Sequence, residues 1–287
     1  MSRRSFLGVG LMGTACAAAG AAAYARHVEP GWLRISRRDV PIPGLRGPIR
    51  IAHLSDLHAS GVVPVDQIAT AVDQTLAGRP DLVCMTGDYV THRLPAGEAY
   101  LDVLTRLANA VPTYAVFGNH DGGSWVAPLG GYRTTDPIAE FLGAAGVVIL
   151  HNAHTEFTVG DQRLYLAGVG DLWANACEPG HAMPATPDAP VVLMSHNPDS
   201  KGMLEPYAWD LMLCGHTHGG QLRLPLIGTP FAPVRDHRIV DGLHRWQQRW
   251  IHVTRGIGNL HGLRFNCRPE ISLLDLQPLS PNGAPNL

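Results

Sequence analysis

Five short apolar runs in this sequence each end in, or lead directly into, an aspartate, an asparagine or a histidine. The runs cover residues 49–57, 81–88, 112–117, 191–196 and 209–214. Their length and composition are typical of buried strands. Segments with helical spacing follow the first three runs, at residues 65–76, 99–108 and 137–144. Strands that alternate with helices predict a parallel sheet, and ligands of such sheets bind at the carboxyl ends of the strands.

The second half of the chain predicts antiparallel pairing as well. Two β-rich runs, 155–159 and 163–169, are joined by Gly160-Asp161, a typical two-residue hairpin connection. Further strands are expected at 250–253 and 271–276. Residues 32–278 contain no internal repeat and no linker long enough to separate two domains, so we expect one domain with mixed pairing.

The polar residues at the strand ends are of the types that bind divalent metal ions. Asp56 and His58 are two residues apart, so on a strand their side chains point to the same side. His216 and His218 have the same spacing and precede two glycines that permit a tight turn. One further side chain comes from each of the other runs, in Asp88, Asn119 and His196.

Each of these residues has an ordinary structural explanation when taken alone. An Asp-x-His pair occurs often by chance, and Asp88 by itself is equally consistent with a helix N-cap. A single His196 fits a buried core histidine, and Asn119 fits simple turn chemistry. The recurrence at separate strand ends favours a metal site, because several buried carboxylates at one edge of a sheet need a cation to be stable.

The order of these motifs, D-x-H, G-D, G-N-H-D, an isolated histidine and G-H-x-H, resembles that of the calcineurin-like metallophosphoesterases. The resemblance implies an α/β fold of two packed mixed sheets flanked by helices. It also implies two metal ions bridged by one aspartate. By this resemblance the ligands of one ion are Asp56, His58, Asp88 and His218. Those of the other ion are Asp88, Asn119, His196 and His216.

The chemistry expected of such a site is hydrolysis of a phosphoester. Two divalent ions about 3.5–4 Å apart lower the pKa of a bridging water, and the hydroxide attacks in line with the leaving group. His120, beside a predicted ligand, is the candidate acid for the leaving group, with Asp121 orienting its ring. A purely structural role for His120 is the alternative. The ligand types suit Mn, Fe, Zn or Co.

Other segments bear on the substrate. Arg255 and Arg264 are candidate phosphate clamps, because a guanidinium can hold two phosphate oxygens; surface salt bridges are the alternative. The loop around Trp125 and Tyr132 follows His120 and is expected either to line the substrate mouth or to pack as a loop. Three segments, 219–222, 254–258 and 264–271, resemble the bacterial branch of twin-arginine-exported or membrane-associated phosphoesterases, some of which hydrolyse UDP-2,3-diacylglucosamine.

The N-terminus has the pattern of a targeting segment. Residues 1–25 combine Arg3-Arg4 with an uncharged Gly/Ala-rich stretch that ends in Ala23-Tyr24-Ala25, which predicts a twin-arginine-type signal peptide. An uncleaved membrane anchor is the alternative, because the stretch is about long enough to cross a bilayer. Residues 26–48 are expected to lead into the domain at 49–278, with one edge strand among them, and residues 279–287 to form a disordered tail.

Charge and targeting together define the expected function. With 22 basic and 24 acidic residues the chain has no basic excess for binding nucleic acid. We expect a phosphoesterase that the twin-arginine export machinery carries to the periplasm or the outer face of the cytoplasmic membrane. Its substrates would be small-molecule or lipid phosphomonoesters or phosphodiesters. The alternatives are a non-catalytic metal-binding envelope protein and a membrane-anchored enzyme acting on UDP-diacylglucosamine or phospholipids.

Overall fold

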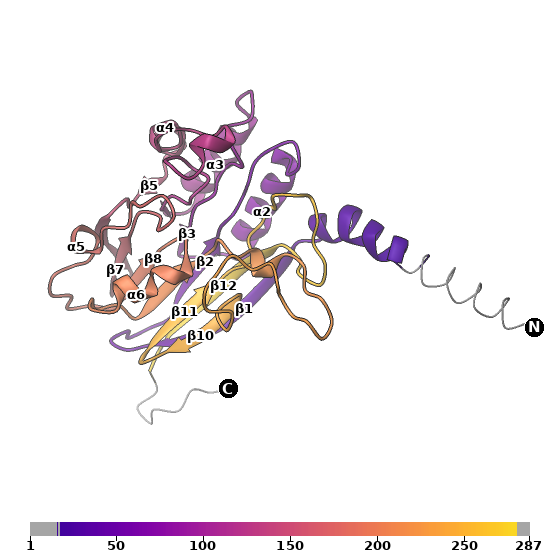
Figure 1. Ribbon diagram of the computed structural model, residues 1–287. Coiled ribbons are helices and arrows are strands. Elements are labelled where there is room, and N and C mark those ends of the chain that lie inside the picture. The colour runs from indigo at the N-terminus through magenta and orange to yellow at the C-terminus, as the bar shows by residue number, and fades with distance from the viewer. Residues whose placement is uncertain (1–15, 17, 280–287) are drawn as a thin grey trace, which may run out of the picture.

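Two six-stranded sheets pack face to face in the computed structural model, which describes residue 16 and residues 18–279 (Figure 1). The first sheet has the order β1 (Arg34–Ile42), β12 (Glu270–Pro278), β2 (Ile49–Leu54), β3 (Leu82–Met85), β4 (Thr113–Ala115) and β5 (Val148–Ile149). The second has the order β10 (Gly242–Trp246), β11 (Arg249–Val253), β9 (Leu211–Cys214), β8 (Val191–Met194), β7 (Gln162–Gly168) and β6 (Ala153–Val159). Both sheets mix parallel and antiparallel pairs, as predicted.

The central strands are apolar on both faces because each sheet is covered on both sides. In β2, Ile49 and Ile51 pack into the core between the sheets, whereas Ala52 and Leu54 pack under the helices of the first sheet. Successive side chains of a strand point to opposite faces, so a strand buried on both sides reads as a continuous apolar run. This is why the apolar runs predicted these strands.

Three helices cover the outer face of the first sheet (Figure 1). They are α2 (Val65–Ala77), α3 (Ala99–Ala110) and α4 (Asp136–Ala144), close to the predicted ranges. Each buries one apolar stripe, such as Ile68 and Val72 of α2. The second sheet is covered by loops and by two one-turn helices, α5 (Pro179–Ala182) and α6 (Lys201–Leu204). The helices thus lie on the outer faces of the two sheets. One edge of the sandwich is formed by the loops that follow the strands.

Two strands extend the sheets beyond what the apolar runs predict. β1 is the edge strand expected before residue 49, and it pairs in parallel with the C-terminal strand β12 along its whole length, from Arg34 opposite Glu270 to Ile42 opposite Pro278. β10 was not predicted. It is an edge strand whose side chains are mostly half-buried and partly polar, so it lacks an apolar run.

The chain approaches the domain through a helix at residues 18–27, which projects from the body of the protein (Figure 1). Tyr24 of this helix lies edge-on to Phe265, with 6.4 Å between ring centroids. No helix within the described residues is both long and apolar enough to span a membrane. The predicted targeting segment falls mainly outside those residues, as does all of the predicted tail except Leu279.

Candidate metal centre

All seven predicted metal ligands are buried at one edge of the sandwich, six of them in loops and His218 in the short 3-10 turn His218–Gly220. The loops follow β2, β3 and β4 of the first sheet and β8 and β9 of the second, which are neighbouring strands in each sheet. Backbone hydrogen bonds join loop to loop: the amides of Asp56 and His58 donate to the carbonyls of Gly87 and Asp88. Because the strands run parallel, their carboxyl ends bring these distant segments together.

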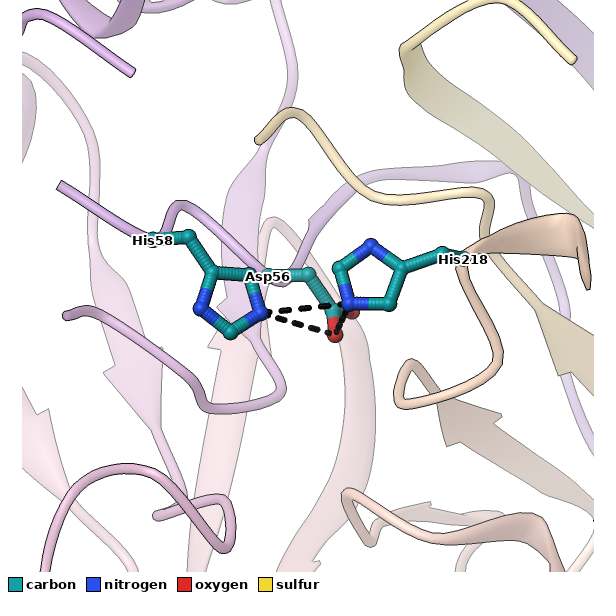
Figure 2. Close-up of side chains that lie close together, drawn as sticks. All are labelled: Asp56, His58 and His218. Atoms are coloured by element: carbon teal, nitrogen blue, oxygen red, sulfur yellow. Dashed lines mark hydrogen bonds and ion pairs between the residues drawn. The ribbon is translucent and has the colours of Figure 1, made fainter. Parts of the chain in front are cut away.

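One group of side chains consists of Asp56, His58 and His218 (Figure 2). The Nε2 atoms of His58 and His218 lie 3.2 Å apart. Asp56 Oδ1 lies 3.3 Å from Nε2 of His218 and 3.9 Å from Nε2 of His58. Three potential ligand atoms from loops after β2 and β9 thus converge on one point.

A second group surrounds His196 and His216. Nδ1 of His216 lies 2.9 Å from Oδ1 of Asn119 and 3.2 Å from Nε2 of His196. Asp88 connects this group to the first, because its Oδ2 lies 3.3 Å from Nε2 of His196 and 3.4 Å from Nε2 of His58. One carboxylate oxygen therefore faces an imidazole of each group, which is the position expected of a bridging ligand.

The spacing of these atoms fits divalent ions. Ligands held at ~2.1 Å from an ion are about 3.0 Å apart in octahedral and about 3.4 Å apart in tetrahedral geometry. Most of the separations above fall at or near these values. Oxygen and imidazole donors together suit Mn, Fe, Zn or Co. The residues present therefore fit two divalent metal ions.

The electrostatics of the site also favour cations. Burial lowers the pKa of His58 and of His218 to about 3, so both imidazoles are neutral at physiological pH, the form that binds metal. Burial acts in the same direction on His196, but the adjacent Asp88 carboxylate outweighs it and raises the pKa of this histidine. Two buried carboxylates, Asp56 and Asp88, face mainly neutral rings, an arrangement that costs free energy without a compensating cation.

The backbone at the site is strained in a way typical of functional loops. Five of the predicted ligands have left-handed backbone angles, with φ between 48° and 69°: His58, His218, Asp56, Asp88 and His216. Close approach of the backbone also requires Gly118, where a Cβ atom would clash with Oδ1 of Asp88. The backbone of these loops therefore adopts unfavourable angles in order to place the ligand side chains.

His120 borders this cluster and is held in one orientation. Its amide donates to Oδ1 of Asp88 at 2.9 Å, and its ring Nδ1 lies 2.7 Å from the carbonyl oxygen of Thr91. A carbonyl can only accept, so Nδ1 carries the proton and Nε2 is left for the site. The same device orients His196, whose Nδ1 lies 2.6 Å from the carbonyl of Thr86.

Asp121 has a different role from the expected one. Within the described part of the chain, its carboxylate accepts hydrogen bonds only from backbone amides, those of Asp88, Tyr89 and Gly118. The prediction that Asp121 orients the His120 ring is therefore wrong, and the Thr91 carbonyl takes that place. Asp121 instead fastens the loop of Asp88 to that of Asn119. Sequence reasoning missed Thr86 and Thr91 because backbone carbonyls carry no residue-type signal.

The two predicted phosphate clamps are engaged elsewhere. Arg264 is fully buried, and its guanidinium donates to the backbone carbonyls of Cys267, Arg255 and Gly258 at 2.9, 2.8 and 2.6 Å. The prediction of a phosphate clamp is wrong for this residue, which stabilises the loop behind the site. Arg255 is largely buried and forms a 2.6 Å ion pair with Asp241. For Arg255 the structure therefore contains the alternative interaction, a salt bridge.

Aromatic side chains border the cluster, although not the whole set that was expected. The ring of Trp125 lies 4.7 Å from that of His120, centroid to centroid. Tyr132 instead packs against the loop between β3 and α3, with its ring under Arg93 at 5.1 Å and its hydroxyl accepting the amide of Leu94 at 3.3 Å. Trp173 was not predicted, yet its ring lies 4.2 Å from His216 and edge-on to it. Its own loop after β7 offered no motif that could have identified it.

The fold and this cluster place the protein in a known class. The family model of the calcineurin-like phosphoesterases matches residues 49–220, which includes every residue of both groups. The chain belongs to this family and is a metal-dependent phosphoric ester hydrolase.

Relatives match along most of the chain. Phosphodiesterase YaeI of Escherichia coli (strain K12) is 44% identical over 255 residues, which cover 88% of this chain and 92% of that protein. The uncharacterized metallophosphoesterase YkuE of Bacillus subtilis is 28% identical, covering 96% of this chain and 98% of its own length. UDP-2,3-diacylglucosamine pyrophosphatase LpxG of Chlamydia trachomatis is 27% identical, covering 88% and 91%.

Proposed function

We propose that the protein hydrolyses phosphodiester bonds at a centre of two divalent metal ions, with His120 as the acid that protonates the leaving group. The observation that carries this proposal is the position of Asp88 Oδ2, 3.4 Å from His58 and 3.3 Å from His196. Asp56, His58, Asp88 and His218 would hold one ion. The other would be held by Asp88, Asn119, His196 and His216.

The bound ions would supply an activated water as nucleophile and would neutralise charge on the phosphoryl oxygens. The chain's own residues do the rest. Asp88 and Asp56 provide the negative charge that retains the ions. His120 keeps Nδ1 bonded to Thr91, so only Nε2 can deliver a proton at the site. Burial of the whole cluster excludes bulk water from the ligands.

The relatives' names bear on the substrate. The 44% identity to a protein named phosphodiesterase supports diesters as the substrate class. The similarity to LpxG supports a second candidate, hydrolysis of a lipid-linked pyrophosphate. We also propose that the protein is exported, on the strength of Arg3-Arg4 and the Gly/Ala-rich stretch that follows them. Cleavage after Ala25 or retention as an anchor are the two forms that this export can take.

The experiment compares metal content and turnover in the same preparations. Wild type, His120→Asn and Asp88→Asn are loaded with Mn²⁺. Hydrolysis is followed for bis-p-nitrophenyl phosphate, which releases nitrophenolate, a good leaving group, and for diphenyl phosphate, which releases the more basic phenolate. We expect His120→Asn to keep its metal and to lose turnover of diphenyl phosphate by a factor of about 10²–10⁴, with a much smaller loss for bis-p-nitrophenyl phosphate. Asp88→Asn should lose both bound metal and turnover.

The matched control is His92→Asn, at the exposed histidine that follows Thr91 in the sequence. This variant should leave both the bound metal and the turnover unchanged. Wild-type turnover of diphenyl phosphate by His120→Asn would remove the proposed acid. Metal bound to the wild type without turnover of any ester would instead support a non-catalytic metal-binding protein. Preference for a pyrophosphate-linked lipid over both diesters would favour the second candidate.

A further inference from the structure

A cavity of about 550 Å³ opens beside the metal centre. Its lining includes Trp125, Leu172, Trp173, Asp199, Met203 and Arg235. These residues come from the loop after His120, the loop after β7, the segment that includes α6, and the long loop after β9. The cavity is thus built from loops of both sheets, on the same edge of the sandwich as the predicted ligands.

Two indoles connect this cavity to the reacting groups. Trp125 touches His120 at 4.7 Å between ring centroids, and Trp173 touches His216 at 4.2 Å. The two indoles lie 5.6 Å from each other and are tilted by 37°. They therefore form one continuous aromatic wall, which begins at the proposed acid and continues into the cavity.

The wall is shaped to receive a flat group on its surface. Indoles 5.6 Å apart are already in contact as an aromatic pair, so a ligand ring lies against their open faces and not between them. Trp173 keeps 36% of its surface exposed and Met203 keeps 46%, which leaves apolar area for such a ring. An aromatic ring gains both apolar contact and stacking at this wall.

Polar groups in the lining of the cavity argue against a hydrocarbon chain. Asp199 lies there, its carboxylate accepting the Arg235 amide at 3.0 Å, and the Arg235 side chain is exposed. A long acyl chain filling this space would remove these charged groups from water without replacing their hydrogen bonds. A ring with polar edge atoms could instead form hydrogen bonds with these charged groups.

We propose that this cavity binds a planar aromatic group of the substrate, a nucleobase or another aryl ring, by stacking on Trp125 and Trp173. The inference deepens the proposed function, because it concerns the organic group attached to the phosphorus bound at the same centre. Stacking of a base on an aromatic side chain typically contributes enough to change affinity about tenfold or more. The two tryptophans would then determine which esters the enzyme prefers.

The test measures binding without requiring turnover. Mn²⁺-loaded protein is titrated calorimetrically with phenylphosphonate, cyclohexylphosphonate and methylphosphonate, which share one phosphonate head and differ in the attached group. We expect the wild type to bind phenylphosphonate about tenfold more tightly than methylphosphonate, with cyclohexylphosphonate nearer to methylphosphonate. Trp173→Ala should bring the phenyl-to-methyl ratio close to one, and Trp173→Phe should retain much of it.

Trp32→Ala is the matched control, because Trp32 is half-exposed and stacks with Arg268 at 4.0 Å, away from the cavity lining. Its ratio should equal that of the wild type. A wild-type ratio near one, or an undiminished ratio in both Trp173→Ala and Trp125→Ala, would overturn the proposal. Equal gains from cyclohexyl and phenyl groups would also overturn it, because apolar bulk would then be recognised in place of a flat ring. Absence of turnover in the separate ester assay concerns only the proposed function.

Discussion

Two buried histidines between the sheets offer a quantitative test of the structure. His53 of β2 and His252 of β11 face each other, with 2.9 Å between their Nδ1 atoms, and Nε2 of His53 lies 2.9 Å from Oγ1 of Thr86. Both rings are almost completely buried. Two facing ring nitrogens can share one proton, whereas a second proton would place two N–H groups against each other. The folded pair is therefore held neutral.

Burial lowers the pKa of His252 to about 3, and it lowers that of His53 as well. An unfolded histidine titrates near pH ~6.5. Between these two values the unfolded chain binds a proton that the folded chain does not, so stability falls as the pH falls through this window. At pH 5 the unfolded group is about 1.5 pH units below its pKa, which corresponds to about 2 kcal/mol for His252.

The assay is urea unfolding of wild type and His252→Gln at pH 7.5 and at pH 5. Glutamine keeps a hydrogen-bonding side chain without a titrating group. The metal-site histidines titrate in both proteins, and His53 keeps its buried site and its contact with Thr86 in both, so the difference between the two reports the loss of His252. We expect the wild type to lose about 2 kcal/mol more than the variant on this acidification. Equal losses in the two proteins would refute the reasoning, and His181→Gln, at an exposed position, should behave like the wild type.

Two further outcomes are expected. Arg264→Met should lower the free energy of unfolding by about 3 kcal/mol, because several buried carbonyls lose a charged donor. Urea unfolding measures this loss. A raised KM with an unchanged free energy of unfolding would instead restore a role of Arg264 in phosphate binding. The protein recovered from the cell envelope should begin at Arg26, which mass spectrometry of the intact chain can determine, whereas a chain that still carries residues 1–25 would show that the segment is an anchor.

Local patterns were sufficient to predict most elements and the loops that carry the site. The apolar runs at 81–88 and 209–214 correspond to β3 and β9, and the helical spacing at 65–76 corresponds to α2. Burial on both faces makes a strand continuously apolar, and an amphipathic helix repeats its apolar residues every three to four positions. Both signals lie within a few neighbouring residues, so they can be read from the chain alone. β10, an edge strand without such a run, could not.

The sequence by itself therefore determined the family, the sheet-forming segments and the residue types available to bind metal. The resemblance also grouped the ligands, including His58 and His218, which are 160 positions apart. Only the tertiary structure decided the contacts outside those motifs, such as that of Trp173, which reaches His216 from a loop with no motif. Arg264, expected at the substrate, turned out to hold backbone carbonyls. The physical reason is that such contacts depend on which distant loops the crossovers between strands bring together. They also depend on the direction of backbone carbonyls such as that of Thr86. Neither property can be inferred from the residue types of a short segment.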